Sequence, residues 1–264
     1  MILVYQAVAP VVWATAGGQA STSTSVTTAP LTSIQPNDII LLFLAYECTS
    51  AQTLGSPTSL VFGSFTWTTR VGVTGQGYQM PNKLTAGLYW ARNTTGSTLT
   101  NRAFTANISS TFDNATIIAI QVRGASSTTS PFSGASATAT TTTSNQTPVI
   151  TLNTSAPALS LGFWTSPFSV IYAAPSGWAL KQSVLNTGAT YYSYSFCFSK
   201  TQTSQQTNVS TSSATTMTVV NALDPVPIVK ELVDCSPPYP IPVAPVAPVA
   251  PVAPVAPVAP ATSL

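Results

Sequence analysis

The sequence predicts an all-β fold, an antiparallel jelly-roll-like β-sandwich with an extended C-terminal polyproline II tail. Apolar and polar residues alternate in several short segments, most clearly at residues 192–199, where four aromatic residues alternate with serine and cysteine. A period of two is typical of strands, and no long segment shows the 3.6-residue period of a helix. A proline at every third position near the C-terminus favours polyproline II, because each ring fixes φ near −65°.

Five segments carry the strongest strand signals: residues 39–45, 84–91, 118–122, 159–164 and 192–199. Ile39–Ala45 is apolar throughout, as expected for a central strand that is covered on both faces. Weaker strands are expected at residues 2–13, 60–68, 148–152, 170–173, 178–184 and 215–220. Turn-rich segments are expected between them, at residues 15–28, 75–82, 93–100, 126–144 and 201–213. About ten strands with short turns favour a sandwich or jelly roll.

Changes in composition divide the chain into three parts. Residues 1–223 are the expected β-sandwich domain, residues 224–240 a proline-broken connector, and residues 241–264 a Pro-Val-Ala repeat. In polyproline II the repeat is a stiff strap on the order of 60 Å long. The prolines of this assembly strap are Pro242, Pro245, Pro248, Pro251, Pro254, Pro257 and Pro260.

Charge is scarce. Of 264 residues only 5% are charged, with six acidic and eight basic residues, no histidine and a net charge of +2. This charge is too small to predict a nucleic-acid or anionic-membrane partner, and without histidine a zinc site or a Ser-His or Cys-His catalytic site is not expected. The sequence therefore predicts a non-enzymatic protein without a metal or cofactor. With so few carboxylates, stability is also expected to change little in acid.

Three cysteines allow more than one arrangement. Cys48 and Cys197 are a possible disulfide, with Cys235 then free or intermolecular, and three unpaired thiols are the alternative. The alternation at residues 192–199 places Cys197 on the face opposite the aromatic rings, where it can meet Cys48 or solvent.

The N-terminus is read as a strand. Residues 1–16 are apolar and end in Ala14-Thr15-Ala16, which resembles a signal-peptidase site, but the segment lacks a basic start and contains Pro10. We expect this strand to pair within its own sheet, or else to add to a neighbour's sheet edge. No apolar run outside the tail is long enough for a transmembrane helix.

The sequence suggests two kinds of contact with sugars, namely covalent glycosylation and glycan binding. Possible glycosylation sequons lie at Asn93, Asn107, Asn114, Asn153 and Asn208, while a sixth, at Asn145, is weakened by Pro148. Tryptophan rings can also stack on bound glycans. Trp164 is the best candidate because it is out of phase with the apolar side of its strand, and Trp67, Trp90 and Trp178 are further candidates, with core packing as the alternative for all four.

Four short motifs carry a resemblance to a known group of proteins. Asn37–Leu42, Leu88–Ala91, Ile117–Gly124 and Pro175–Trp178 resemble segments of β-sandwich domains of virus particles, such as bacteriophage tail-fibre, tail-tip and head-decoration proteins. The resemblance covers residues 1–223 and implies a place on a virion surface, outside the cell, without implying a ligand site.

The expected function is therefore structural: a virion-surface protein that decorates or cements a capsid, or forms a spike or fibre. Its expected partners are further copies of itself and other particle proteins, such as a major capsid or tail protein. The alternative is a carbohydrate-binding or adhesin module of a secreted or cell-surface protein or extracellular filament, with host glycans as its partner.

Overall fold

The computed structural model describes residues 2–8, 10–48, 57–61, 65–76, 83–125, 131–132, 137–140, 149–150, 158–166, 174, 177–187, 193–202, 209–210, 216–223 and 226–233. These residues form strands, bridges, turns and bends, with no helix among them, which confirms the all-β prediction for this part of the chain. No helix in the described part is long and apolar enough to cross a membrane. The strand pairings with a described register are all antiparallel.

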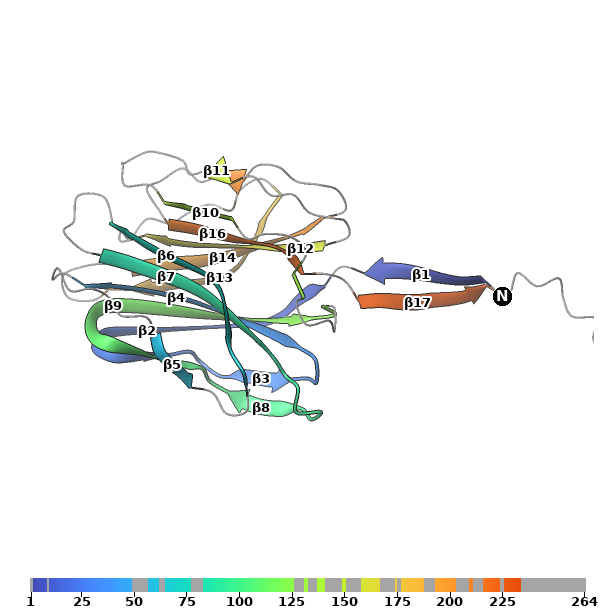
Figure 1. The fold of residues 1–264 in the computed structure, drawn as a ribbon, viewed down its shortest axis with the longest axis horizontal. Coiled ribbons are helices and arrows are strands. Elements are labelled where there is room, and N and C mark those ends of the chain that lie inside the picture. Colours follow the sequence, from blue (N-terminus) through green and yellow to red (C-terminus); the bar gives the residue numbers. More distant parts are fainter. Residues whose placement is uncertain are drawn as a thin grey trace, which may run out of the picture. The chain divides into compact units, whose positions relative to one another are not determined.

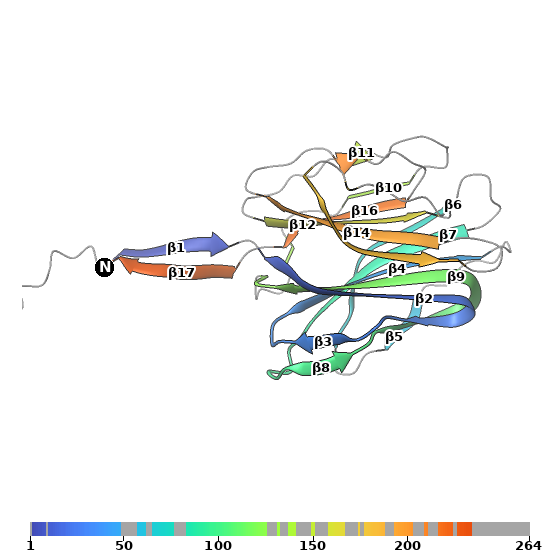
Figure 2. The same cartoon turned by 180° about the vertical axis from the view of Figure 1, so that it is seen from behind.

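The strands form two larger and three small sheets (Figures 1 and 2). The six-stranded sheet has the order β2-β9-β4-β7-β6, with β5 also paired to β9, and the five-stranded sheet has the order β10-β16-β12-β14-β13. Three further pairs, β1-β17, β3-β8 and β11-β15, are formed by the described residues. The strands are β1 (Ile2–Val8), β2 (Val11–Thr27), β3 (Leu31–Ile34), β4 (Ile39–Cys48), β5 (Pro57–Val61), β6 (Thr68–Gln76), β7 (Lys83–Arg92), β8 (Leu99–Arg102), β9 (Thr105–Arg123), β10 (Ala137–Thr140), β11 (Val149–Ile150), β12 (Ala158–Ser166), β13 (Ala179–Asn186), β14 (Ser193–Gln202), β15 (Val209–Ser210), β16 (Thr216–Leu223) and β17 (Val226–Val233).

Strand β4 is the centre of the six-stranded sheet, as its apolar run predicted. It pairs with β9 on one side and β7 on the other, and its side chains from Ile39 to Tyr46 are at most 1% exposed. Alternate residues contribute to different faces, so that Phe43 packs with one core cluster and Leu42 with another.

Two apolar clusters cover the two faces of this sheet. The inter-sheet core joins β4, β7 and β9 to β12, β13 and β14, and Phe43 stacks on Phe163 with ring centroids 5.2 Å apart. The second cluster lies on the opposite face, where Leu31 and Ile34 of β3 and Phe104 pack against the even-numbered residues of β4. Large apolar side chains on both faces explain why β4 carries no polar residue before Glu47.

The long β2-β9 ribbon bends back on itself, which the sequence did not predict. Residues 15–28 were expected to be turn-rich, yet nearly all belong to β2. A register shift between Ser23 and Ser25 and a positive φ of 47° at Thr22 mark the bend. The backbone of Thr27 then returns against Gly18, leaving no room for a side chain there. The pairing with β9 overrides the local preference of serine and threonine for turns.

Strand β14 shows which face of the alternating segment is buried. Ser195, Cys197 and Ser199 are buried, and Cys197 belongs to the inter-sheet core. The expectation that Cys197 might meet solvent is therefore wrong. Small side chains are needed there because the large rings of the opposing sheet fill the space.

Several weaker strand predictions need correction. The expected strand at residues 2–13 is split into β1 and the start of β2, and residues 60–68 are divided between β5 and β6. Strand β10 forms within residues 126–144, which were expected to be turns. The expected strand at residues 170–173 lies outside the described residues.

The N-terminal strand pairs within its own chain, with β17 in a two-stranded sheet. The two strands run in opposite directions (Figure 1). Strand β17 occupies residues 226–233, within the segment 224–240 that was expected to be a proline-broken connector, and the division of the chain at these residues stays a prediction. By its internal contacts the chain divides into Tyr5–Ile228 and a unit of Met1–Val4 with Val229–Leu264. The Pro-Val-Ala strap lies outside the described residues, and its polyproline II conformation stays a prediction.

Candidate functional site

A tight turn leads into β4 and prepares a polar cluster. Pro36 and Asn37 occupy the centre of the turn, Asn37 has a φ of 67°, and the Asp38 backbone N–H donates to the Gln35 carbonyl at 3.1 Å. Proline followed by asparagine with positive φ is the pattern of a type II turn. The turn places the Asp38 carboxylate against the end of β9.

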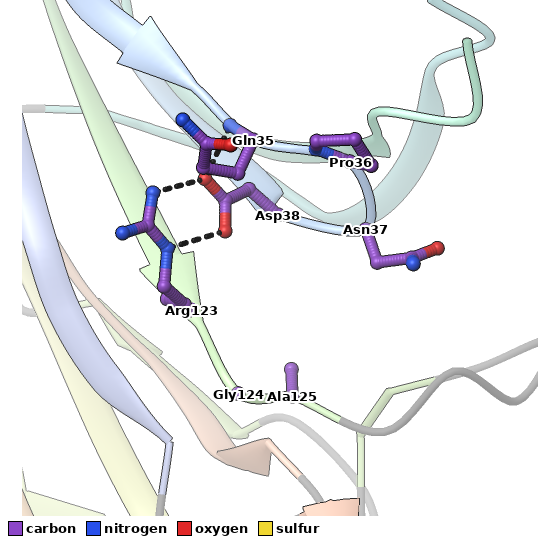
Figure 3. A pocket seen from close by; sticks show the side chains of 7 residues that line it. All are labelled: Gln35, Pro36, Asn37, Asp38, Arg123, Gly124 and Ala125. Atoms are coloured by element: carbon purple, nitrogen blue, oxygen red, sulfur yellow. Dashed lines mark hydrogen bonds and ion pairs between the residues drawn. The ribbon is translucent and has the colours of Figure 1, made fainter. Parts of the chain in front are cut away.

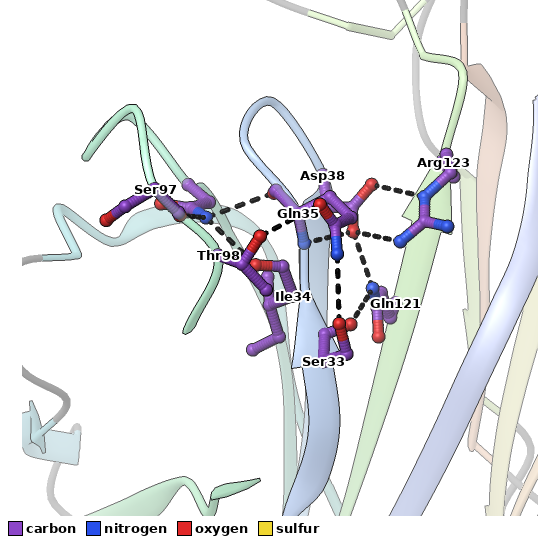
Figure 4. Close-up of polar contacts among 9 residues, drawn as sticks. Ser33, Ile34, Gln35, Asp38, Ser97, Thr98, Gln121 and Arg123 are labelled. Atoms are coloured by element: carbon purple, nitrogen blue, oxygen red, sulfur yellow. Dashed lines mark hydrogen bonds and ion pairs between the residues drawn. The ribbon is translucent and has the colours of Figure 1, made fainter. Parts of the chain in front are cut away.

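The Asp38 carboxylate is buried and fully engaged (Figure 4). Arg123 donates from Nε to Oδ1 and from Nη2 to Oδ2, each at 3.0 Å. Gln121 Nε2 donates to Oδ2 at 2.5 Å and the Gln35 backbone N–H at 2.7 Å. A carboxylate that accepts hydrogen bonds from four donors has a structural role, namely to join the turn to β9.

Arg123 extends this cluster to an exposed ring. Its guanidinium carbon lies 3.8 Å from the centroid of the Trp13 ring, while Trp13 is 56% exposed. Because Asp38 holds one edge of the guanidinium through two hydrogen bonds, the cation in turn fixes the ring. Trp13 is thus a rigid, solvent-facing aromatic surface on β2.

A cleft of about 400 Å³ adjoins Arg123 (Figure 3). It is lined by the turn residues Gln35, Pro36, Asn37 and Asp38 and by Arg123, Gly124 and Ala125. The Asn37 side chain is exposed and points away from the Asp38–Arg123 pair. With the charge of Asp38 neutralised, the cleft offers a proline ring, neutral amides and the edge of one guanidinium. These groups suit an uncharged ligand with hydrogen-bond acceptors, and they include no nucleophile beside a base.

Exposed apolar side chains gather on the outermost strands of the two larger sheets. Among the described residues, the large apolar side chains that are exposed are Val11 and Trp13 on β2 and Leu180 and Leu185 on β13. These strands contact each other: Thr15 Oγ1 lies 3.1 Å from Gln182 Oε1 and donates to the Lys181 carbonyl at 3.4 Å. Val11 and Trp13 come before Thr15 on β2, and Leu180 comes before Lys181 on β13. All three residues therefore lie toward the same end of the contact between the two strands. We call these three residues the Trp13 platform.

A second polar cluster is buried near the far end of β4. Asn114 Nδ2 donates to Glu47 Oε1 at 3.1 Å, and Ser21 joins Asn114 to Asn186 through oxygen–oxygen distances of 3.2 and 3.0 Å. Burial raises the pKa of Glu47 to about 7, the hydrogen bond from Asn114 lowers it, and the nearby charge of Asp113 raises it. The carboxyl thus titrates near neutral pH, inside the protein rather than in a cleft.

Within the described ranges, no group of three or more histidine, cysteine, aspartate or glutamate residues lies close enough to hold an ion. The lack of histidine in the sequence removes the commonest neutral ligand.

The glycan-stacking prediction for Trp164 is wrong. Trp164 is indeed out of phase with the apolar side of β12, but it is fully buried, and it packs edge-on against Trp178 with centroids 6.3 Å apart. Trp67 packs against Phe104, and Trp90 against Phe132, as the core alternative predicted. Both faces of β12 are covered, which strand periodicity does not reveal.

The sequence analysis missed Trp13, the tryptophan that is exposed. Val12 packs against the inter-sheet core and Ala14 against the opposite cluster, and Trp13 lies at the register shift between them, where the alternation of the strand is broken. The sequence does not indicate which of the two sides is buried.

Two of the predicted glycosylation sites are contradicted. Asn93 is buried, and its Nδ2 donates to the carbonyls of Ile34, Gln35 and Ser97 at 3.2, 3.0 and 2.9 Å. Asn114 is buried beside Glu47. A sugar on either nitrogen would have no space and would displace these bonds. Asn107 is half-buried and stays a prediction, while Asn153 and Asn208 lie outside the described residues.

Cys197 is a buried thiol that takes part in no disulfide in the structure. The side chain of Cys48 and the whole of Cys235 lie outside the described residues, so the expected Cys48–Cys197 bridge stays a prediction about the oxidised protein. Burial raises the pKa of the Cys197 thiol well above its ordinary value, although the charge of Lys181 lowers it. A buried thiol of this kind reacts slowly with alkylating agents.

Comparison with known proteins gives no relative: no family model, no curated protein and no solved structure matches the chain.

Proposed function

We propose that this chain is a non-enzymatic structural protein of a virion surface, acting as a capsid decoration or cement protein, spike or fibre. In this proposal the strands form a jelly-roll-like sandwich head, and the Pro-Val-Ala strap is a polyproline II arm that joins the head to another molecule. The partners are further copies of the chain and other particle proteins.

The observation that carries the proposal is the Trp13 platform. An exposed, fixed tryptophan lies with Val11 and Leu180 on the outermost strands, in a chain with only 5% charged residues. Large apolar side chains that are exposed on edge strands favour a contact between proteins. The fully bonded Asp38 and the absence of histidine support an assembly surface more than a reaction centre.

A deletion tests this function. Removal of residues 240–264 from the full chain should leave the melting temperature of the head nearly unchanged and abolish or weaken assembly. Negative-stain microscopy and sedimentation velocity measure assembly, and circular dichroism measures the fold. The proposal is wrong if the shortened chain assembles as well as the full chain.

A carbohydrate-binding or adhesin module is the second candidate, and Trp13 now favours it in place of Trp164. The ring lies beside a guanidinium that lines a cleft, which is a common arrangement for stacking a sugar. A glycan array separates the two functions: binding that Trp13→Ala abolishes supports the module, and no binding leaves the structural function.

A further inference from the structure

We propose that Glu47 operates a proton-controlled latch that holds β13 against the six-stranded sheet. Strand β13 is the last strand of the five-stranded sheet, where it pairs with β14. The latch is a series of hydrogen bonds from Glu47 through Asn114 and Ser21 to Asn186 on β13. The latch is complete when Glu47 carries a proton, and it lacks one hydrogen when Glu47 does not. This property goes beyond the proposed function and does not depend on it.

The latch connects the two larger sheets. Asn114 on β9 is paired with Glu47 on β4, and its Nδ2 donates to Glu47 Oε1 at 3.1 Å. The hydroxyl of Ser21, the β2 partner of Asn114, lies 3.2 Å from Asn114 Oδ1 and 3.0 Å from Asn186 Oδ1. Ser21 is exposed, whereas the carboxyl and both amides belong to residues that are at most 3% exposed. The two amide oxygens therefore depend on the Ser21 hydrogen.

Ser21 has one hydrogen for two acceptors. A hydroxyl donates a single hydrogen bond, and Asn114 and Asn186 both turn an amide oxygen toward it. The Asn186 amide is fixed, because its nitrogen donates to one backbone carbonyl of β2 at 2.6 Å and to one of β9 at 3.2 Å. The Asn114 amide is fixed as long as Glu47 is ionised, since a carboxylate only accepts hydrogen bonds. In the ionised state the two amide oxygens thus compete for one hydrogen.

A proton on Glu47 ends this competition. The Asn114 amide can then turn over, so that the Glu47 hydroxyl donates to Asn114 Oδ1 and Asn114 Nδ2 donates to Ser21 Oγ. The Ser21 hydrogen becomes available to Asn186 alone. Because a buried acceptor that loses its hydrogen bond costs more than a bond gains, the proton strengthens the tie to β13.

The surroundings of Glu47 place this change near neutral pH. Burial raises its pKa to about 7, although the hydrogen bond from Asn114 lowers the pKa, and the charge of Asp113 on β9 raises it. The folded protein therefore holds the proton below about pH 7 and releases it above that pH. We expect the latch to be closed in acid and weakened in alkali.

Asp113 is the charged side chain that acts on Glu47 among the described residues. Strand β2 has no ionisable residue. The ionisable residues of the other strands around Glu47 lie farther along their strands (Arg92, Arg123, Lys181), are held neutral by burial (Tyr89, Cys197), or have side chains outside the described residues (Lys83, Tyr194, Lys200). The pH at which the latch changes is thus set by burial and by one neighbouring carboxylate.

Two other contacts between β13 and β2 do not titrate. A side chain at Gly17 would collide with Val184, so the two strands pack closely there. Farther along, Thr15 Oγ1 lies 3.1 Å from Gln182 Oε1. Thr15 supplies a matched control, because it also joins β2 to β13 through a hydroxyl but bonds Gln182 in place of the latch.

Hydrogen exchange of the full-length protein measures the latch. The backbone amides of β13 and β4 are followed by mass spectrometry between pH 5 and pH 9, and each rate is divided by the intrinsic rate of the unfolded chain at the same pH. We expect β13 to exchange by local opening and to be less protected than β4. Its protection should fall by about fivefold as the pH rises through the pKa of Glu47, which corresponds to the loss of one hydrogen bond.

Three variants assign this fall to the latch. Glu47→Gln carries an amide that can donate as the protonated acid does, so β13 should keep its acidic protection at every pH. Ser21→Ala removes the shared hydrogen, so β13 should show the lower protection at every pH. Thr15→Val should lower the protection of β13 by a similar factor at each pH and leave the fall in place. Melting temperatures check that each variant is folded.

The carboxyl of Glu47 gives a reciprocal readout. If its proton tightens β13 about fivefold, cutting the latch must lower the pKa of Glu47 by about 0.7, because the two equilibria are linked. Titration of the carbon-13-labelled carboxyl by NMR should show this decrease in Ser21→Ala and an unchanged pKa in Thr15→Val. A serine with a purely structural role would not produce this difference.

Several results would overturn the latch. One is a β13 protection that does not change as Glu47 titrates, and another is a fall that remains in Ser21→Ala or in Glu47→Gln. Equal protection of β13 and β4 at every pH would mean that β13 does not open by itself. An equal pKa of Glu47 in Ser21→Ala and Thr15→Val would separate the proton from the contact with β13.

Discussion

Glu47 makes the stability of this protein depend on pH in a direction that its composition does not predict. The side chain is 1% exposed, and burial raises its pKa to about 7 from an ordinary value of 4.5. A carboxyl with a raised pKa binds its proton more tightly in the folded than in the unfolded protein. Its contribution to stability is therefore fully present below pH 4.5 and is lost as the pH rises from 4.5 to about 7.

The size of the effect follows from the two pKa values. The interval from 4.5 to about 7, at about 1.4 kcal/mol for each pH unit, gives a loss of about 3 kcal/mol. Because the chain has few carboxylates, we expected its stability to change little in acid. Glu47 alters that expectation: the part of the free energy of unfolding that it controls increases on acidification.

Glu47→Gln isolates this contribution. Glutamine has nearly the same shape, keeps an oxygen that accepts the Asn114 hydrogen bond, and does not titrate. At pH 4.5 the two proteins should differ little in free energy of unfolding, while at pH 8 the variant should be more stable by about 3 kcal/mol. The difference between the two proteins removes the titration of all other groups that they share.

Urea unfolding followed by tryptophan fluorescence, at pH 4.5, 6 and 8 and constant ionic strength, measures this difference. Equal m-values for both proteins show that the same surface is exposed on unfolding. A difference between variant and wild type that stays constant across this range would refute the reasoning, because it would mean that Glu47 titrates alike in both states.

Three further predictions concern packing, charge and thiol chemistry. Gly18→Ala should destabilise the protein by about 2 kcal/mol or more in urea unfolding, because the new methyl group meets the Thr27 carbonyl; an unchanged midpoint would mean that the bend is less tight. Asp38→Asn should cost about 3 kcal/mol, since it leaves Arg123 without its anion, and in a double-mutant cycle the loss should shrink when Arg123→Met is also present; additive losses would contradict the pairing. Cys197 should resist iodoacetamide in the native protein, because burial raises its pKa, and should react after denaturation; resistance that only a reducing agent removes would instead indicate the disulfide.

The elements that the sequence predicted best are those whose environment is uniform along the strand. Ile39–Ala45 is apolar at every position, and the structure places it between two strands and two cores. The prediction of β2 failed for the opposite reason. Its serine- and threonine-rich part resembles a loop, but long-range pairing with β9 holds it extended, and that partner lies about 90 residues away along the chain.

The candidate site shows the same division. Pro36 and Asp38 stand directly before the apolar run of β4 in the sequence, and the turn that they form is a local structure. The contact of Asp38 with Arg123 joins residues 85 apart in sequence, and no local pattern indicates such a pair. Trp13 was overlooked for the same reason, since its exposure and its cation are both set by distant strands.

The sequence by itself determined that the described chain is built of strands, because alternation and apolar runs are local properties of the backbone period. It also determined the scarcity of charge and the proline repeat, which composition alone reveals. Only the tertiary structure decided which face of each strand is covered. Burial depends on what packs opposite, so Trp164 and Asn93 lie inside while Trp13 faces the solvent.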